Sequence, residues 1–138
     1  MCIKNLYNQL EDSEIPDFLK EKIEKSNELT GGAFFLKVFS SSKITSEVYY
    51  EQFYKKVFYG GSVDIKLKEL VRLRLAGISG CKYCISVDEN SALNNGVTEK
   101  EIFDAKHGNI ENFSGIENNL LKLSEHIALN PPSERADI

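Results

Sequence analysis

Two cysteines separated by two residues, Cys81 and Cys84, are the residues of this sequence best suited to chemistry. Residues three apart on a helix lie on one face with their Cα atoms about 5 to 6 Å apart, which is within the range that a disulfide bridges. A position at the start of a helix also favours thiolate over thiol, because unpaired N–H groups and the helix dipole stabilise negative charge. The pair therefore predicts a redox-active disulfide centre.

The same pair has two other interpretations. It could be half of a structural zinc site, but such a site needs four ligands, and the remaining candidates, Cys2, His107 and His126, contain no second pair. It could also be two inert buried thiols. The redox pair is our main prediction, and we expect neither a metal nor a cofactor.

The segments around the pair predict an all-α fold of about six or seven helices, because their apolar residues recur at helical spacing between glycine and proline breaks. The first helix is expected to begin at Pro16. The next four are expected from Gly32 to about Phe39, from Lys43 to Phe58, from Asp64 to Ile78, and from Cys81 to Asn95. Capping boxes at Thr98 with Glu101 and at Ser114 with Glu117 predict the last two.

Four of these helices carry apolar stripes, and the stripe of the first helix consists of Phe18, Leu19 and Ile23. The stripe residues are Ile44, Val48, Phe53 and Val57 in the third helix, Leu67, Leu70, Val71, Leu75 and Ile78 in the fourth, and Ile116, Leu120, Leu123 and Ile127 in the last. A helix that is apolar over most of its circumference must bury more than one face, and in a short chain the second face can meet another subunit. We therefore expect a homo-oligomer.

Size and charge restrict the classes of protein further. The 138 residues fit a single domain, 1–138, with 130–138 as a tail. The net charge of −4, from 17 basic and 21 acidic residues, argues against nucleic-acid binding. The longest apolar run, 33–36, is far too short to span a membrane, and the N-terminus lacks the apolar segment of a signal peptide. We expect a soluble cytoplasmic protein, in whose reducing compartment a CxxC points to catalysis or metal binding.

The residues from Glu69 to Ile102 follow the pattern E-x11-C-K-Y-C-x3-D-x3-A-x3-G-x4-E-I. This pattern resembles the carboxymuconolactone decarboxylase family, in particular its AhpD-like alkylhydroperoxidase branch, whose members carry E-x11-C-x2-C-x3-H. The similarity is clearest from Phe58 to Ala105, and the family-like core is expected over residues 44–106. The resemblance implies an AhpD-like helical domain that assembles into trimers or hexamers.

The resemblance also implies an activity. It indicates a CxxC oxidoreductase of antioxidant defence, with peroxidase or peroxiredoxin activity, that reduces a peroxide or a protein disulfide. A peroxiredoxin or a lipoyl-bearing reductant is the implied redox partner. Carried over residue by residue, the resemblance makes Cys84 the attacking thiolate, Cys81 the resolving thiol and Glu69 the distal member of a proton relay.

The position of the family's relay histidine holds Asp88 in this chain. A carboxylate beside Cys84 disfavours the thiolate by like-charge repulsion, whereas an imidazole can accept its proton. Two arrangements could restore the chemistry: Asp88 and Glu69 could share a proton, or Arg72 could neutralise the charge. Otherwise the helix dipole favours Cys81 as the nucleophile, with Cys84 resolving.

The sequence is also compatible with two alternative functions. One is a lactone decarboxylase of the same family, although such members generally lack a CxxC. The other is a non-catalytic helical assembly module with relic cysteines, an alternative that the missing histidine supports.

Overall fold

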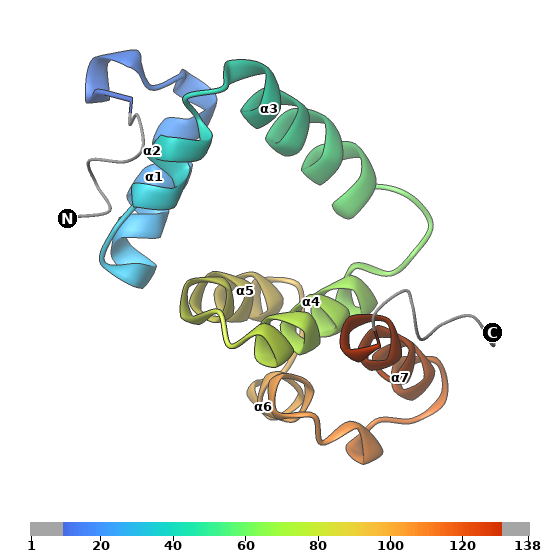
Figure 1. Cartoon of the computed structure of the whole chain (residues 1–138). Helices are drawn as coiled ribbons and strands as arrows, with labels where there is room; N and C mark the ends of the chain where they lie inside the picture. The colour runs from blue at the N-terminus through green and yellow to red at the C-terminus, as the bar shows by residue number, and fades with distance from the viewer. Residues whose placement is uncertain (1–9, 131–138) are drawn as a thin grey trace. The chain divides into compact units, whose positions relative to one another are not determined.

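The computed structural model describes residues 10–130, and this part of the chain is helical without a β-strand (Figure 1). The prediction of an all-α fold is confirmed. The chain divides into two compact units, of which one ends at Gly61 and the other begins at Ser62. That the whole chain forms a single domain stays a prediction. Cys2 and the predicted tail beyond residue 130 lie outside the described residues.

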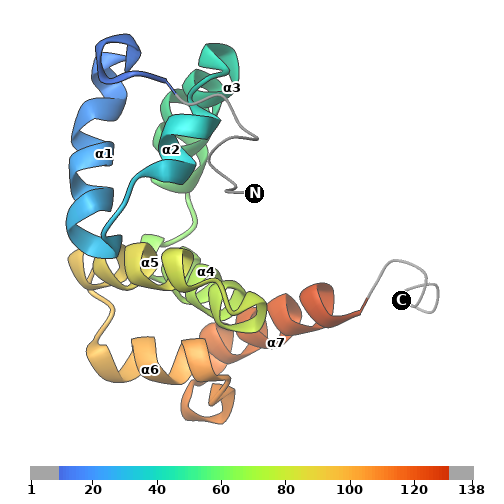
Figure 2. The ribbon, with the colours of Figure 1, turned by 60° about the vertical axis from the view of Figure 1, so that its left-hand side comes forward.

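The first unit contains η2 (Asp12–Glu14), α1 (Asp17–Thr30), α2 (Phe34–Phe39), α3 (Lys43–Glu47) and η3 (Val48–Phe58). Helices α1 and α2 lie close together and enclose a small core (Figures 1 and 2). The core residues are Ile15, Leu19, Ile23, Ala33 and Leu36. Helix α1 begins after Pro16, as the sequence predicts, and ends at Gly31, whose φ of 73° suits a residue without a side chain.

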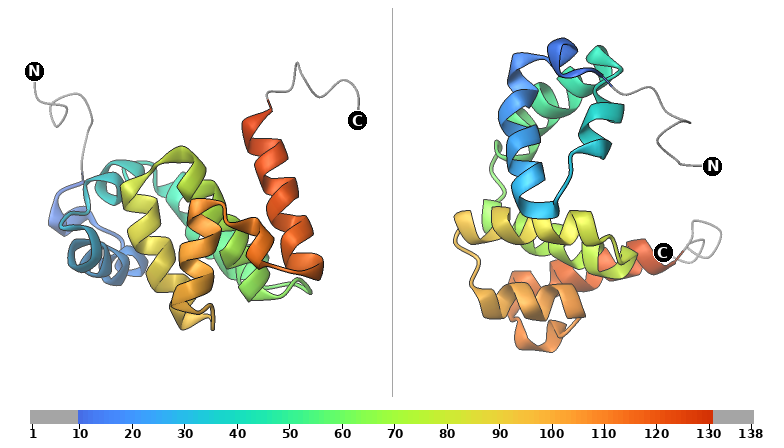
Figure 3. Two further views of the ribbon diagram at one scale, coloured as in Figure 1. Left: turned by 90° about the horizontal axis from the view of Figure 1, so that it is seen from below. Right: turned by 90° about the vertical axis from the view of Figure 1, so that its left-hand side faces the viewer.

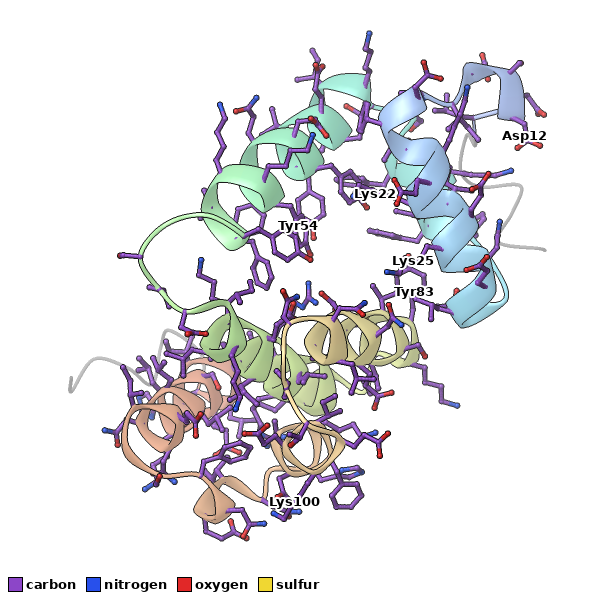
Figure 4. The ribbon with its side chains drawn as sticks, turned by 180° about the vertical axis from the view of Figure 1, so that it is seen from behind. Asp12, Lys22, Lys25, Tyr54, Tyr83 and Lys100 are labelled. Carbon is purple, nitrogen blue, oxygen red and sulfur yellow. A yellow bond between two sulfur atoms is a disulfide. The ribbon has the colours of Figure 1, made fainter. Side chains whose placement is uncertain are left out.

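Helix α3 continues directly into η3, whose turns are wider than those of an α-helix. The N–H of Tyr59 donates to the carbonyl of Tyr54, five residues earlier, at 2.8 Å. The sequence predicts one α-helix here, but the stripe from Ile44 to Val57 is spaced by four, five and four residues, which fits wider turns better. Aromatic rings gather along η3, among them that of Tyr54 in Figure 4.

The second unit contains α4 (Ile65–Ser79), α5 (Lys82–Asn94), α6 (Glu99–His107), η4 (Ile110–Asn112) and α7 (Gly115–Leu129). Helix α4 is central, because it packs against α5, α6 and α7 (Figure 3). The core of this unit consists of Leu70, Leu73, Ala92, Val97, Ile102, Ala105, Phe113 and Leu121. This packing fixes α5, which carries the cysteine pair, against α4, which carries Glu69.

The helix ends of this unit follow recognisable sequence signals, with one exception. Asp64 caps α4, which ends at Gly80, and Thr98 forms the predicted capping box with Glu101. The predicted box at Ser114 is wrong, because its side chain makes no capping hydrogen bond. Gly115 has a left-handed φ of 56°, which departs from the regular first turn that a capping hydroxyl needs.

The predicted stripes identify the buried faces only in part. In α4 the buried residues are Glu69, Leu70, Leu73 and Ala76, so Leu70 alone belongs to the predicted stripe. In α7 the buried residues are Leu121 and Ser124, whereas Ile116, Leu123 and Ile127 are exposed. The stripe of α3 and η3 is also exposed, with Ile44 at 78% and Val57 at 60%. Within residues 10–130, no helix combines the length and the apolar character that crossing a membrane requires.

Gly77 allows the backbones of α4 and α6 to approach each other closely. A Cβ atom at this position would lie 2.0 Å from the carbonyl oxygen of Lys106, a backbone atom that cannot move without displacing α6. We expect Gly77→Ala to lower the free energy of unfolding by about 2 to 3 kcal/mol, measured by urea denaturation. Gly32→Ala is the control, because its Cβ atom meets no neighbour within 4 Å. Equal stabilities of the two variants would contradict this packing.

Candidate functional site

The cysteine pair lies at the N-terminal end of α5, in the second unit. Cys81 is the residue that caps the helix, and its Sγ accepts a hydrogen bond from the N–H of Cys84 at 3.2 Å. The two sulfurs form a disulfide, with the Cα atoms 5.3 Å apart, as the spacing predicts. Both residues are partly exposed, and Tyr83 between them extends from the same helix (Figure 4). The two cysteines are therefore linked, lie at a helix N-terminus and are partly accessible to solvent.

Glu69 lies on α4 and is fully buried, with 0% of its surface exposed. Its Oε2 accepts a hydrogen bond from Nη2 of Arg72 at 2.6 Å. Its Oε1 accepts from the hydroxyl of Ser91 at 2.7 Å and from the side-chain amide of Asn95 at 2.9 Å. A buried carboxylate is tolerated when it is paired and hydrogen-bonded, and Glu69 meets both conditions.

Arg72 connects the carboxyl groups of Glu69 and Asp88. Its Nη2 binds Glu69, and its Nε lies 3.2 Å from Oδ1 of Asp88, so one guanidinium forms ion pairs with both. Neutralisation by Arg72 is one of the two arrangements that the sequence suggests for restoring the chemistry beside Cys84; the other is a proton shared by Asp88 and Glu69. The structure brings Glu69, Arg72 and Asp88 together in one cluster between α4 and α5.

The surroundings of Asp88 perturb its titration. Burial raises the pKa of Asp88 to about 6, and the carboxylate of Glu69 adds to the increase, whereas the guanidinium of Arg72 opposes it. Asp88 is one helical turn after Cys84 on α5, so the two side chains share a face. A carboxyl group that changes charge near neutral pH therefore lies next to the cysteine pair.

Ser91 and Asn95, which bind Glu69, are not among the predicted site residues. Their spacing contains a signal that could have found them, because Cys84, Asp88, Ser91 and Asn95 follow one another at intervals of four, three and four residues. Residues at these intervals form a single stripe along an α-helix. A polar stripe that starts at a cysteine predicts a buried polar partner on the neighbouring helix, which here is Glu69.

The perturbed pKa of Asp88 predicts how stability depends on pH. Its folded value of about 6 exceeds the ordinary 3.8, so the folded protein binds more protons between these values and loses stability as the pH rises through 6. Asp88→Asn removes this dependence. We expect the wild type, relative to this variant, to be about 1 kcal/mol more stable at pH 5 than at pH 7. Urea denaturation of the wild type and the variant, each with its disulfide intact, measures the free energy of unfolding at both pH values. If the difference between the two proteins does not depend on pH, the burial of this charge is contradicted.

The histidines lie elsewhere. His107 ends α6, where its Nδ1 is 2.8 Å from the carbonyl oxygen of Phe103, and its ring contacts that of Phe103 at an interplanar angle of 34°. His126 is exposed near the end of α7, close to Asn130. In the part of the chain from 10 to 130, no three cysteine, histidine, aspartate or glutamate residues are grouped so that they could hold a metal ion.

Comparisons with known proteins extend this description. The chain is 32% identical over 77 residues to a protein of Bacillus subtilis (strain 168) described as "Uncharacterized protein YdfG". The match covers 55% of this chain and 52% of that relative, so the chain aligns with about half of its relative's length. No solved structure matches the chain significantly. Residues 48–108, which contain η3, α4, α5, α6 and the cysteine pair, match the model of the carboxymuconolactone decarboxylase family.

Proposed function

We propose that this protein is a CxxC thiol-disulfide oxidoreductase of the AhpD-like alkylhydroperoxidase type, acting in antioxidant defence in the cytoplasm. The observation that carries the proposal is the disulfide between Cys81 and Cys84 at the N-terminus of α5. A helix N-terminus favours the thiolate, and partial exposure lets an oxidant reach it. The match of residues 48–108 to the family model supports the same assignment.

The reaction uses both cysteines. The thiolate of one attacks the terminal oxygen of a hydroperoxide, so the O–O bond breaks, an alcohol leaves after taking a proton, and a sulfenic acid remains on sulfur. The thiol of the other cysteine attacks that sulfur, which forms the disulfide and releases water. A peroxiredoxin or a lipoyl-bearing dithiol protein is the proposed redox partner, and a dithiol returns the pair to two thiols by exchange.

The resemblance to the AhpD-like pattern assigns the attack to Cys84 and the resolving step to Cys81. One structural observation instead favours Cys81 as the attacking cysteine, because its sulfur lies at the helix N-terminus. Single variants decide between the two assignments. After treatment with peroxide, the variant that retains the attacking cysteine forms a sulfenic acid that dimedone traps, whereas the other variant remains unlabelled.

We further propose that the protein forms a homo-oligomer, a trimer or hexamer as the resemblance implies. Each unit exposes an apolar face: Ile44, Val48, Phe53 and Val57 in the first, and Ile116, Leu123 and Ile127 on α7 in the second. Phe39, Ile44, Thr45, Val48, Tyr49 and Phe53 also line a shallow groove of about 560 Å³. Exposed apolar patches of this kind are typical of protein interfaces. Light scattering of the full chain tests the proposal.

A peroxidase assay tests the proposed activity. The reduced protein is mixed with hydrogen peroxide or an organic hydroperoxide, and dithiothreitol, dihydrolipoamide or a reduced peroxiredoxin is supplied in turn. Turnover with one of these dithiols supports the proposal. Absence of turnover with every reductant, together with thiols that react no faster than a free cysteine, would instead favour the non-catalytic module. Activity towards a lactone that survives loss of both cysteines would favour the decarboxylase alternative.

A further inference from the structure

The hydrogen bonds of Glu69 restrict what its carboxylate can do. Arg72, Ser91 and Asn95 all donate to its two oxygens. An ionised carboxylate only accepts hydrogen bonds and has about four lone-pair sites, of which these donors occupy three. The side chain is also fully buried, so a lost donor could not be replaced by bulk water. Glu69 is therefore arranged to hold its neighbours in place.

Asp88 is arranged differently. Its Oδ1 lies 3.2 Å from Nε of Arg72, a longer contact than the 2.6 Å that joins Arg72 to Glu69. Its side chain retains 11% exposure, whereas that of Glu69 has none. Side chains on an α-helix point towards its N-terminus, so the carboxyl of Asp88 is directed back towards the turn that contains Cys84. Asp88 thus combines a looser ion pair with a position beside the thiol.

We infer that Asp88, and not Glu69, is the carboxyl group that exchanges a proton with Cys84, and that Glu69 holds Arg72, which in turn positions Asp88. The inference rests on the proposed function, whose reaction it makes more specific. It assigns to Asp88 the task that a histidine performs in the pattern the chain resembles. It also makes Arg72 and Glu69 positioning residues.

The proton then follows a defined path. The carboxylate of Asp88 takes the proton of the Cys84 thiol, and the thiolate attacks the terminal oxygen of the hydroperoxide. As the O–O bond breaks, Asp88 gives the proton to the departing alkoxide, which leaves as an alcohol. The Cys81 thiol then displaces hydroxide from the sulfenic acid, and its own proton completes a water molecule. The sum is one hydroperoxide and two thiols converted to one alcohol, one water and one disulfide.

The charges around Asp88 suit this exchange. Glu69 and Arg72 face it from α4, and together they carry no net charge. Near the start of its own helix, the thiols of Cys84 and Cys81 are the titratable groups on the same face, whereas the neighbouring Glu89 forms an ion pair with Lys106 of α6. Burial raises the pKa of Asp88 to about 6, and at a pH near this value the carboxyl group both accepts and donates a proton readily.

The test compares two reactions of the reduced full-length protein. One is alkylation of Cys84 by iodoacetamide between pH 5 and 9, resolved from Cys81 by mass spectrometry, which reports the thiolate. The other is the stopped-flow rate of peroxide reduction, which also requires the proton donor. The variants are Asp88→Asn, Glu69→Gln and the control Glu89→Gln, which makes the same charge change one residue further along α5.

For Asp88→Asn we expect the two rates to move in opposite directions. Loss of the negative charge raises the thiolate fraction and hence the alkylation rate at pH 7, while peroxide reduction slows by about tenfold or more because the alkoxide loses its proton donor. The inflection near pH 6 in the alkylation profile disappears. Glu89→Gln keeps that inflection. Glu69→Gln moves it to lower pH, because Asp88 loses a neighbouring negative charge that helps to raise its pKa. A loss of packing alone would not separate the two rates.

The inference is overturned if Asp88→Asn leaves both the inflection and the peroxide rate unchanged, or if Glu69→Gln removes the inflection. If Glu69→Gln does not fold, Ser91→Ala replaces it, because this variant removes one donor from Glu69. The alkylation profile does not depend on peroxide turnover. A protein that fails to reduce peroxide but keeps the Asp88-dependent inflection therefore contradicts the proposed function and leaves the proton exchange supported.

Discussion

Cys84→Ser is expected to reduce the rate of peroxide turnover by at least about a thousandfold, because a hydroxyl group with an ordinary pKa cannot replace a thiolate as a nucleophile. Cys81→Ser is expected to stop catalytic turnover while permitting one reaction with peroxide, because the sulfenic acid on Cys84 then has no resolving thiol. Stopped-flow measurement of the first reaction and a steady-state assay of turnover separate the two effects.

The control for both substitutions is Cys2→Ser. Cys2 lies outside the described residues and outside the CxxC, and we expect this variant to retain the full rate. If Cys81→Ser abolishes the first reaction and Cys84→Ser preserves it, the roles within the pair are exchanged. If neither substitution changes the rate, the activity does not come from this pair.

Asp88→His is expected to increase the rate of peroxide reduction by about tenfold at pH 7. The substitution removes a negative charge from the neighbourhood of Cys84 and supplies a base whose pKa is close to the working pH. Arg72 then keeps its ion pair with Glu69, with which it already forms the shorter contact. A stopped-flow assay of the reduced protein with hydrogen peroxide measures the rate.

Glu89→His is the matched control for that substitution. It places an imidazole on the same helix, next to Asp88 but towards Lys106 of α6, and we expect it to leave the rate unchanged. The contribution of position 88 is contradicted if Asp88→His is no faster than the wild type, or if Glu89→His accelerates the reaction equally.

Sequence patterns predict the structure correctly where one or two neighbouring residues determine a local conformation. Thr98 and Glu101 form a capping box because both side chains reach the backbone within one turn, which makes the pattern independent of the rest of the fold. The spacing of Cys81 and Cys84 similarly fixes their separation, and the disulfide confirms it. Gly80, which ends α4, belongs to the same class of local signal.

Features that depend on packing were harder to predict. The apolar residues of α7 at 116, 123 and 127 have helical spacing, yet Leu121 and Ser124 are the residues that face the core of their unit. The spacing shows that a face is apolar but not whether its own chain covers it. The same reason applies to η3, because a stripe with intervals of four and five residues is compatible with both an α-helix and a wider one.

The candidate site shows both situations. The sequence pattern predicts Glu69 and Asp88 as site residues, but their separate roles depend on which carboxylate receives more hydrogen-bond donors. Ser91 and Asn95 donate hydrogen bonds to Glu69 and thereby determine these roles. Their contribution needs the packing of α5 against α4, which no local pattern of the sequence specifies.

Oxidation of the reduced protein tests the central claim most directly. The full chain is reduced, freed of reductant, treated with a small excess of hydrogen peroxide, alkylated and digested, and the cysteine peptides are measured by mass spectrometry. The account predicts an intramolecular bond between Cys81 and Cys84, recovered as one peptide two hydrogens lighter than its dithiol form and with neither thiol alkylated. Two free, alkylated thiols after excess oxidant would contradict it.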